Sequence, residues 1–400
     1  KNFMSNIFDP QTKIMFHLDK VKSYFDNKNP DPITLEIDPS NACNHSCPFC
    51  ISGHLHLKKY KNTELFNRTM LDKKIFTNLI EDLVKMNIEA VSWTGGGEPT
   101  MNPFLGEAIN FIGNNSKIKQ GMFSNGSMLE RFNLFETITK NLEWIRISID
   151  AGKKDTYDDF RKTNKTNNFD TVIKNIKELV KIKKKTKSNI TIGVGFVVTE
   201  ENYNEIKDFS KIFVNVDVDY CQFKPEIIQI ERTGERDKDK EQISCDFWLK
   251  KVMTLLDNAK SILGNKFECN SYKIEDLIVD VKNYGRNYKM CIGSQFQPCI
   301  GADGNVYVCT NHRGHKQYSY GNLNDKSFRD IWSDINKRRE IMNRIDNVEK
   351  FSKCTHLCKP HESNKILWEI KNNLDKKNYL NTLKDKTQYL KKKIKHPEFI

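Results

Sequence analysis

Three cysteines stand close together early in the chain, at Cys43, Cys47 and Cys50, directly after a strand-like apolar run. A [4Fe-4S] cluster is held by four cysteine thiolates. A compact triplet with no fourth cysteine nearby therefore predicts a cluster with one iron open to another ligand, and chemistry can occur at that iron. The competing interpretations are a zinc knuckle and a redox dithiol, both built on the pair Cys47 and Cys50.

A glycine-rich loop that carries a carboxylate follows a second strand-like run, in Gly95-Gly96-Gly97-Glu98-Pro99. Glycine lets the backbone approach a small ligand closely, and peptide carbonyls or a carboxylate can accept hydrogen bonds from an ammonium group. Similar loops are often plain structural turns. The position of this loop, at the end of a strand, favours a binding role.

Strand-like and helix-like segments alternate along the first half of the chain. Strands are predicted over residues 33–37, 90–94, 120–124, 144–150, 190–198 and 220–224, and helices over 72–86, 127–140, 155–161, 169–183 and about 204–213. Such repeats predict an α/β fold with a parallel sheet and crossover helices, in which ligands bind at the carboxyl ends of strands. The cysteine triplet, the glycine loop, Ser124-Asn125 and residues 148–150 all lie at such ends.

The composition changes after Pro225. A charged stretch over 231–242, a helix over 245–262, a hairpin formed by 297–302 and 305–309, a helix over 328–345 and an amphipathic tail are predicted in that order. We divide the chain into an N-terminal extension (1–30), a barrel unit (31–225), a bridge (226–290), a small second unit (291–362) and a basic helical tail (363–400).

Length and composition favour a globular protein. The 400 residues are 38% hydrophobic and 29% charged, and no apolar run reaches the roughly 18 residues that cross a membrane. The N-terminus lacks a signal peptide's apolar core, so we expect a cytoplasmic protein with reduced or metal-bound cysteines. The net charge of +13 is assigned to lysine-rich solvated faces rather than to nucleic-acid binding. An anionic substrate remains open.

The cysteine spacing resembles the cluster loop of the radical S-adenosylmethionine (radical SAM) superfamily, including an aromatic residue, Phe49, before the third cysteine. The glycine loop resembles the Gly-Gly-Glu-Pro motif of that family. The resemblance covers about residues 33–224 and implies a partial (β/α)6 TIM-like barrel. It also implies that the amine and carboxylate of S-adenosylmethionine occupy the open iron.

This resemblance carries cofactor-binding roles to ten positions at loops and strand ends. They are Phe49, Gly96, Gly97, Glu98, Pro99, Ser124, Asn125, Ser148, Asp150 and Arg161. The glycine loop would hold the cofactor's amine, and Arg161 its carboxylate. A capped strand end or a surface ion pair is the structural alternative for Asp150 and Arg161. The implied chemistry is electron transfer into the sulfonium, homolysis of a carbon–sulfur bond, and hydrogen abstraction by a deoxyadenosyl radical.

The region from residue 291 resembles the SPASM and Twitch extensions of radical SAM enzymes. It offers five cysteines, too few for the two extra clusters of a full SPASM domain, so one auxiliary [4Fe-4S] cluster is expected. Its expected ligands are Cys291, Cys309, Cys354 and Cys358. Because three residues separate the last pair where two are usual, Cys299 is the substitute ligand and His361 a distant one. A zinc ribbon is the structural alternative.

The remaining cysteines, Cys221, Cys245 and Cys269, are expected to be buried as small hydrophobic residues. One of them could instead donate a hydrogen atom to a substrate radical. No general base can be assigned from the sequence.

A fully ligated auxiliary cluster has no open iron, so we expect it to accept an electron from a substrate radical. The net reaction would be a dehydrogenase-like oxidation of a sugar-like, aminocyclitol or nucleotide-linked small molecule, with flavodoxin or ferredoxin as electron donor. About thirty residues precede residue 33, too few for the leader-binding domain of many peptide modifiers. A peptide or protein maturase is the alternative, and a non-catalytic iron–sulfur or zinc protein is the alternative of a different class.

Overall fold

The computed structural model describes residues 13–163, 168–226, 247–269, 287–346, 354, 358–390 and 394–400. Its centre is a ten-stranded sheet in the order β10-β9-β8-β1-β2-β3-β4-β5-β6-β7. The first six strands are parallel. They are β1 (Thr34–Ile37), β2 (Ala90–Trp93), β3 (Lys119–Ser124), β4 (Trp144–Ser148), β5 (Thr191–Val198) and β6 (Tyr220–Pro225).

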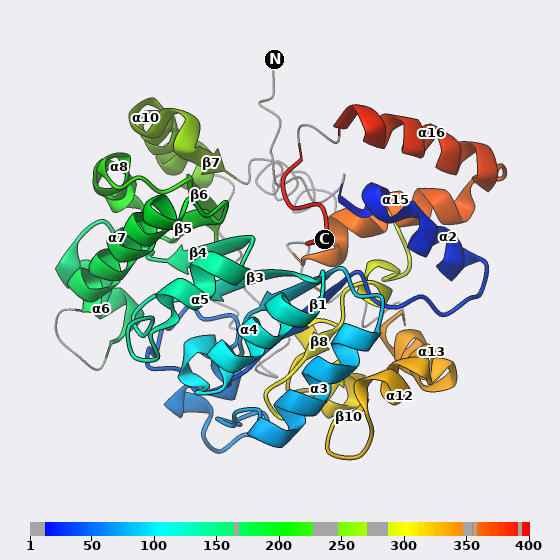
Figure 1. Ribbon diagram of the computed structural model, residues 1–400. Helices are drawn as coiled ribbons and strands as arrows, with labels where there is room; N and C mark the ends of the chain where they lie inside the picture. Colours follow the sequence, from blue (N-terminus) through cyan, green and yellow to red (C-terminus); the bar gives the residue numbers. More distant parts are fainter. Residues whose placement is uncertain are drawn as a thin grey trace.

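Helices follow the curved sheet around its outer face (Figure 1). They are α3 (Lys73–Lys85), α4 (Leu105–Asn115), α5 (Leu134–Asn141), α6 (Lys154–Arg161), α7 (Asn168–Thr186), α8 (Ile206–Asn215) and α10 (Met253–Leu263). Alternate strand residues such as Leu35, Val91 and Ile145 are fully buried in one core with these helices. Because successive strand side chains point to opposite faces, the polar residues between them line the concave face. The predicted α/β partial barrel is therefore confirmed.

The second half of the chain extends this sheet at both edges. The bridge contributes β7 (Phe267–Cys269), which is parallel to β6. The second unit contributes β8 (Cys299–Ile300), which is parallel to β1 and antiparallel to β9 (Asn305–Tyr307). The last edge strand is β10 (Ser319–Asn322). The second unit thus shares one sheet with the barrel, although the unit boundaries themselves stay predictions.

In the described part of the second unit and the tail lie four further α-helices. They are α12 (Phe328–Ser333), α13 (Ile335–Ile345), α15 (Pro360–Asn372) and α16 (Lys376–Leu390). The helix predicted over 328–345 is interrupted at Asp334. The Asp334 side chain accepts a hydrogen bond from the Lys337 backbone amide and so caps the start of α13. The predicted bridge helix matches a π-helical turn and α10, while its first residues, Cys245 included, lie outside the described residues, as does the charged loop.

Other predicted elements differ in extent: the hairpin strands expected over 297–302 and 305–309 are shortened to β8 and β9. The helix expected over 127–140 begins only at Leu134, because Asn133 has a left-handed backbone with φ of 49°. The strand expected over 144–150 ends at Ser148, and Asp150 beyond it is also left-handed, with φ of 60°. Helix α4 was not predicted. No helix among the described residues is long and apolar enough to cross a membrane.

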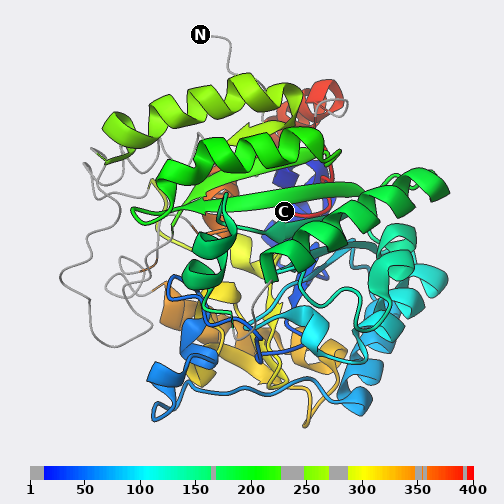
Figure 2. The ribbon, with the colours of Figure 1, turned by 90° about the vertical axis from the view of Figure 1, so that its left-hand side faces the viewer.

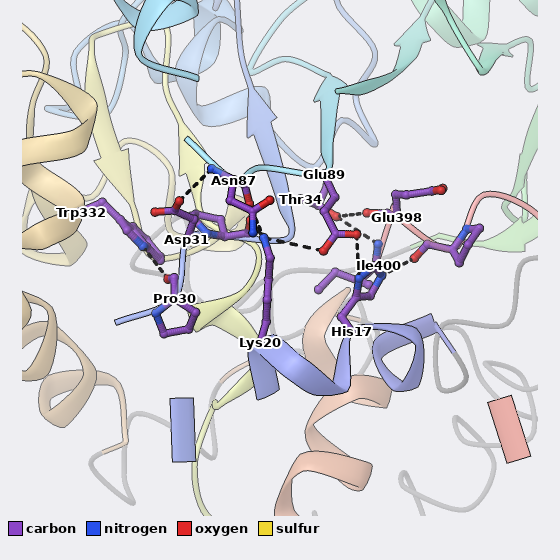
Figure 3. Close-up of polar contacts among 12 residues, drawn as sticks. His17, Lys20, Pro30, Asp31, Thr34, Asn87, Glu89, Trp332, Glu398 and Ile400 are labelled. Carbon is purple, nitrogen blue, oxygen red and sulfur yellow. Dashed lines mark hydrogen bonds and ion pairs between the residues drawn. The ribbon is translucent and has the colours of Figure 1, made fainter. Parts of the chain in front are cut away.

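The beginning and the end of the described chain meet at the start of the barrel strands (Figure 3). His17, just before α2 (Leu18–Phe25), lies 2.9 Å from a Glu89 carboxylate oxygen, and Lys20 lies 3.7 Å from the other. The Thr34 hydroxyl donates to the Glu398 carbonyl at 2.6 Å. These contacts close the amino end of the sheet, opposite the strand ends that carry the predicted site.

Candidate functional site

The first cysteine set lies in the loop that follows β1. Cys47 is buried, and Cys43 and Cys50 are half-buried. Burial raises the pKa of Cys47 to about 12, and burial together with the neighbouring thiols also raises the pKa of Cys43. Among the described residues, no three His, Cys, Asp or Glu side chains converge as ligands of one metal ion would. The three thiols nevertheless share one loop and lie within electrostatic reach of each other.

The glycine loop after β2 lies against the chain that leads into this cysteine loop. The Gly97 amide donates to the Ser40 carbonyl at 2.9 Å. A Cβ atom on Gly97 would lie 2.1 Å from the Ala42 carbonyl oxygen, and one on Gly96 would lie 2.1 Å from Asn41 Oδ1. Only glycine permits such an approach. The two loops are therefore packed together, as a shared ligand site requires.

The Glu98 carboxylate is buried and joins the glycine loop to the end of β3. One of its oxygens accepts from the Ser124 hydroxyl at 2.7 Å and from the Thr100 hydroxyl at 2.6 Å. Its other oxygen accepts from the Asn125 amide at 2.7 Å. Burial still raises the pKa of Glu98. Predicted residues Glu98, Ser124 and Asn125 thus form one network, with Pro99 beginning the turn beside it.

The same network reaches the cysteine loop through residues that the sequence did not single out. The Asn125 side-chain amide donates to Asn44 Oδ1 at 2.9 Å, and Asn44 donates to the Ser127 hydroxyl at 2.8 Å. The only sign in the sequence that Asn44 belongs to the site was its position next to Cys43 in the cysteine loop. Hydrogen bonds therefore fix the cysteine loop to the end of β3.

Asp150 and Arg161 form a buried ion pair behind the cysteine loop. Arg161 Nε also donates to His45 Nδ1 at 3.3 Å, and the Arg161 carbonyl accepts from the Ser46 amide at 3.2 Å. Burial opposes the arginine's charge, but the nearby Cys47 thiol and Asp150 raise its pKa overall. The structure therefore brings the predicted residues Asp150 and Arg161 together, and the two side chains bind each other.

Phe49 and Ser148 complete the set of predicted cofactor residues. The Phe49 ring stacks on Phe160 of α6, with ring centroids 4.3 Å apart. Ser148 ends β4 opposite Gly195 and is half-buried. Both lie at the carboxyl edge of the sheet, where the cysteine loop and the glycine loop also lie.

The second cysteine set lines one pocket of the second unit. Cys291, Cys309, Cys354 and Cys358 all contribute to its wall, with His312 and Asn364 beside them. Burial, with Cys291 and Cys358 nearby, raises the pKa of Cys309 to about 12. These four cysteines are the ones predicted as ligands of the auxiliary cluster, and their role as ligands stays a prediction.

Neither substitute ligand lies in the wall of that pocket. Cys299 is fully buried on β8, with its sulfur 3.8 Å from Arg313 Nη2 and 4.0 Å from Asp38 Oδ2. His361 Nδ1 lies 2.6 Å from the Tyr288 hydroxyl oxygen. Cys358 does line that pocket, and its role as the fourth ligand stays a prediction. Cys221 is fully buried on β6, as predicted, while Cys269 on β7 is only half-buried.

Two family models match the chain in this arrangement. Residues 37–211 match the radical SAM superfamily, and residues 291–359 match SPASM, an iron-sulfur cluster-binding domain. The chain belongs to the radical SAM superfamily. Its cofactors are therefore S-adenosylmethionine and a [4Fe-4S] cluster in the radical SAM domain. The SPASM domain implies additional iron–sulfur clusters.

Two curated proteins resemble this radical SAM protein. The GTPase Obg of Brachyspira hyodysenteriae is 25% identical over 148 residues, which is 37% of this chain but only 21% of that protein. The tungsten-containing aldehyde ferredoxin oxidoreductase cofactor-modifying protein of Pyrococcus furiosus is 22% identical over 316 residues, covering 75% of this chain and 80% of that one.

Solved structures resemble it along most or all of its length. SuiB of Streptococcus suis bound to S-adenosylmethionine has a TM-score of 0.59 at 16% identity, covering all of this chain and 83% of SuiB. SuiB has also been solved with its precursor peptide SuiA. The structure of anSMEcpe with bound AdoMet has a TM-score of 0.56 at 19% identity, covering 88% of this chain and all of that one. At these identities the likeness supports the fold.

The residues present in this radical SAM protein fit the cofactors. Three thiols and a backbone cradle of glycines meet at the carboxyl edge of the sheet, and four more thiols line one pocket. An ion pair that the sequence did not reveal connects the two regions. Arg313 Nε lies 2.8 Å from Asp38 Oδ2, directly after β1, and Arg313 Nη1 donates to the Ser52 hydroxyl at 2.9 Å. In the ribbon of Figure 2, the yellow strands of the second unit lie beside the blue part of the barrel unit, as the pairing of β8 with β1 requires.

Proposed function

We propose that this protein oxidises its substrate by two electrons, using S-adenosylmethionine at the first cysteine set and an auxiliary [4Fe-4S] cluster at the second. The observation that carries the proposal is the presence of two separate thiol sets, three in one loop and four around one pocket. When bound, the cluster and cofactor supply a deoxyadenosyl radical that abstracts hydrogen. We assign the four thiols of the pocket to one auxiliary cluster, because four thiolates complete a [4Fe-4S] site.

In this proposal the chain's own residues position the cofactor and shield it. The carbonyls of the glycine loop would accept hydrogen bonds from the cofactor's amine, while Glu98 holds the loop on β3 through Ser124 and Asn125. Arg161 is buried beside Cys47 and stabilises the thiolate form of that residue. Ser148 offers a hydroxyl at the end of β4.

Side chains on the concave face support a polar small-molecule substrate, such as a sugar-like, aminocyclitol or nucleotide-linked compound. Arg146 of β4 hydrogen-bonds Gln222 of β6, and its guanidinium lies 4.4 Å from the centre of the Phe123 ring. A Cβ atom on Gly195 would have Arg146 as its nearest neighbour, at 3.7 Å. A guanidinium and an amide suit hydroxyl or anionic groups.

A peptide substrate is the second candidate. The likeness to SuiB, which has been solved with its precursor peptide SuiA, extends over this whole chain. Substituting Arg146 by methionine separates the candidates, because a small anionic substrate would lose affinity, whereas a peptide held mainly outside the barrel would not.

Anaerobic reconstitution with iron and sulfide tests the proposed function. We expect about eight irons per chain, for two [4Fe-4S] clusters, and release of 5′-deoxyadenosine after reduction by flavodoxin, ferredoxin or dithionite. Stoichiometric zinc without cleavage of S-adenosylmethionine would refute the proposal. Cleavage without any oxidised product from the true substrate would refute the oxidative part alone.

A further inference from the structure

The side chain of Asn364 faces a sulfur of the second cysteine set. Asn364 lies on α15 and is 1% exposed. Its Oδ1 accepts from the Gly293 amide at 2.6 Å. A backbone N–H can only donate, so this bond fixes the orientation of the side-chain amide. The amide nitrogen is therefore the atom that faces Cys291 Sγ, at a distance of 3.4 Å.

The other groups around Cys291 show why this donor matters. Asp346 accepts from the Cys291 backbone amide at 2.8 Å and adds a nearby carboxyl group. The Ser294 hydroxyl donates to the Cys291 carbonyl at 2.8 Å. The Asn364 amide donates to the sulfur itself, and the Ser294 side chain is a second group beside that thiol.

We propose that Asn364 raises the reduction potential of the auxiliary cluster by donating a hydrogen bond to its Cys291 ligand. Hydrogen bonds to the sulfurs help to set the potential of iron–sulfur clusters, and groups behind the ligands tune a metal centre. A donor withdraws charge from the thiolate and so favours the reduced, more negative cluster. This inference rests on the proposed function, because a higher potential suits an electron acceptor.

The test uses the full chain with Cys43, Cys47 and Cys50 all changed to alanine, so that only the auxiliary cluster remains. Its iron content and its midpoint potential, followed by electron paramagnetic resonance, are measured after anaerobic reconstitution. Asn364→Asp keeps the acceptor for Gly293 but replaces the donor with an anionic oxygen, whereas Asn364→Leu removes both groups. Asn322→Leu is the control, because the Asn322 amide donates to a backbone carbonyl, that of Asp303, rather than to sulfur.

We expect full iron content and a potential more negative than that of the parent in both Asn364 variants. The shift should be larger for Asn364→Asp, and the control should not move. An unshifted potential in Asn364→Asp overturns the inference, and so do equal shifts in all three variants. Loss of iron from the Asn364→Asp variant also overturns the inference, because Asn364 would then be needed for the cluster to bind rather than for its potential. A parent that binds no iron refutes the proposed auxiliary cluster itself, a different and distinguishable failure.

Discussion

At the scale of single residues, candidate site residues that are close in the sequence could be predicted. Contacts between residues that are far apart in the sequence could not. Cys43, Cys47 and Cys50 share one loop, so their spacing alone predicted a three-thiol site. Asn364 reaches Cys291 from 73 positions away. Nothing in the local sequence marks such a residue, because asparagine is common on helix surfaces. Only the packing of α15 gives it a role.

The choice of the fourth auxiliary ligand gives the first prediction. Changing Cys358 to alanine should remove the auxiliary irons, because Cys358 lines the pocket with the three other thiols. Changing Cys299 to alanine should leave the iron content unchanged, because its sulfur lies beside Asp38 and Arg313 instead. Iron analysis after reconstitution measures both. Equal iron loss in the two variants would contradict the assignment.

The Glu98 network gives the second prediction. Glu98→Gln places an amide against the Ser124 and Asn125 donors, so one buried donor loses its acceptor. That change costs about 1–3 kcal/mol of unfolding free energy and should weaken S-adenosylmethionine binding about tenfold (~1.4 kcal/mol). Urea unfolding and equilibrium dialysis measure the two effects. Glu107→Gln, which alters an exposed ion pair with Lys73, should change stability by less than about 1 kcal/mol.

At the scale of elements, periodicity located the strands, and backbone detail set their ends. Helix α4 was missed because Gly106, Gly113 and terminal asparagines lower its helix propensity. The signal was nevertheless present, since Leu105, Ala108, Ile109 and Ile112 form a buried stripe at helical spacing. The short β8 could not be predicted as a partner of β1, because their pairing joins segments more than 260 residues apart.

The ion pair between β1 and the second unit gives the third prediction. Arg313→Met leaves Asp38 buried without its cation, and breaking a buried pair costs about 3–5 kcal/mol. Lys119→Met removes an exposed pair with Glu143 and should cost at most about 1 kcal/mol. Urea unfolding of both variants measures the difference. A loss in Arg313→Met no larger than that in Lys119→Met would show that the pair does not fix the second unit.

At the scale of the whole molecule, the two cysteine sets belong to one structure. Strand β1 leads into the first set, and its neighbour β8 belongs to the unit that holds the second. The sequence suggested two consecutive units, because each has its own motif. The sequence could not show that the two units share a sheet, because that depends on which edge strand of the barrel β8 pairs with.

The end of the described chain gives the fourth prediction, on pH. Burial, followed by the charge of Lys13, lowers the pKa of His396 from 6.5 to about 4. The unfolded chain therefore binds more protons between pH 6.5 and 4, so this group's stabilisation is lost as the pH falls through that window. The loss reaches up to about 3 kcal/mol. His396→Asn should flatten the pH dependence of urea unfolding there, and an unchanged slope would contradict the prediction.

Strand β1 has a neighbour on each side, β2 and β8, although it is the first strand of the barrel. An uncovered first strand would present a row of unpaired backbone groups, which is a template for aggregation. The cluster-binding unit therefore also protects the edge of the barrel. Mutations that detach this unit should produce insoluble protein before they produce an inactive soluble enzyme.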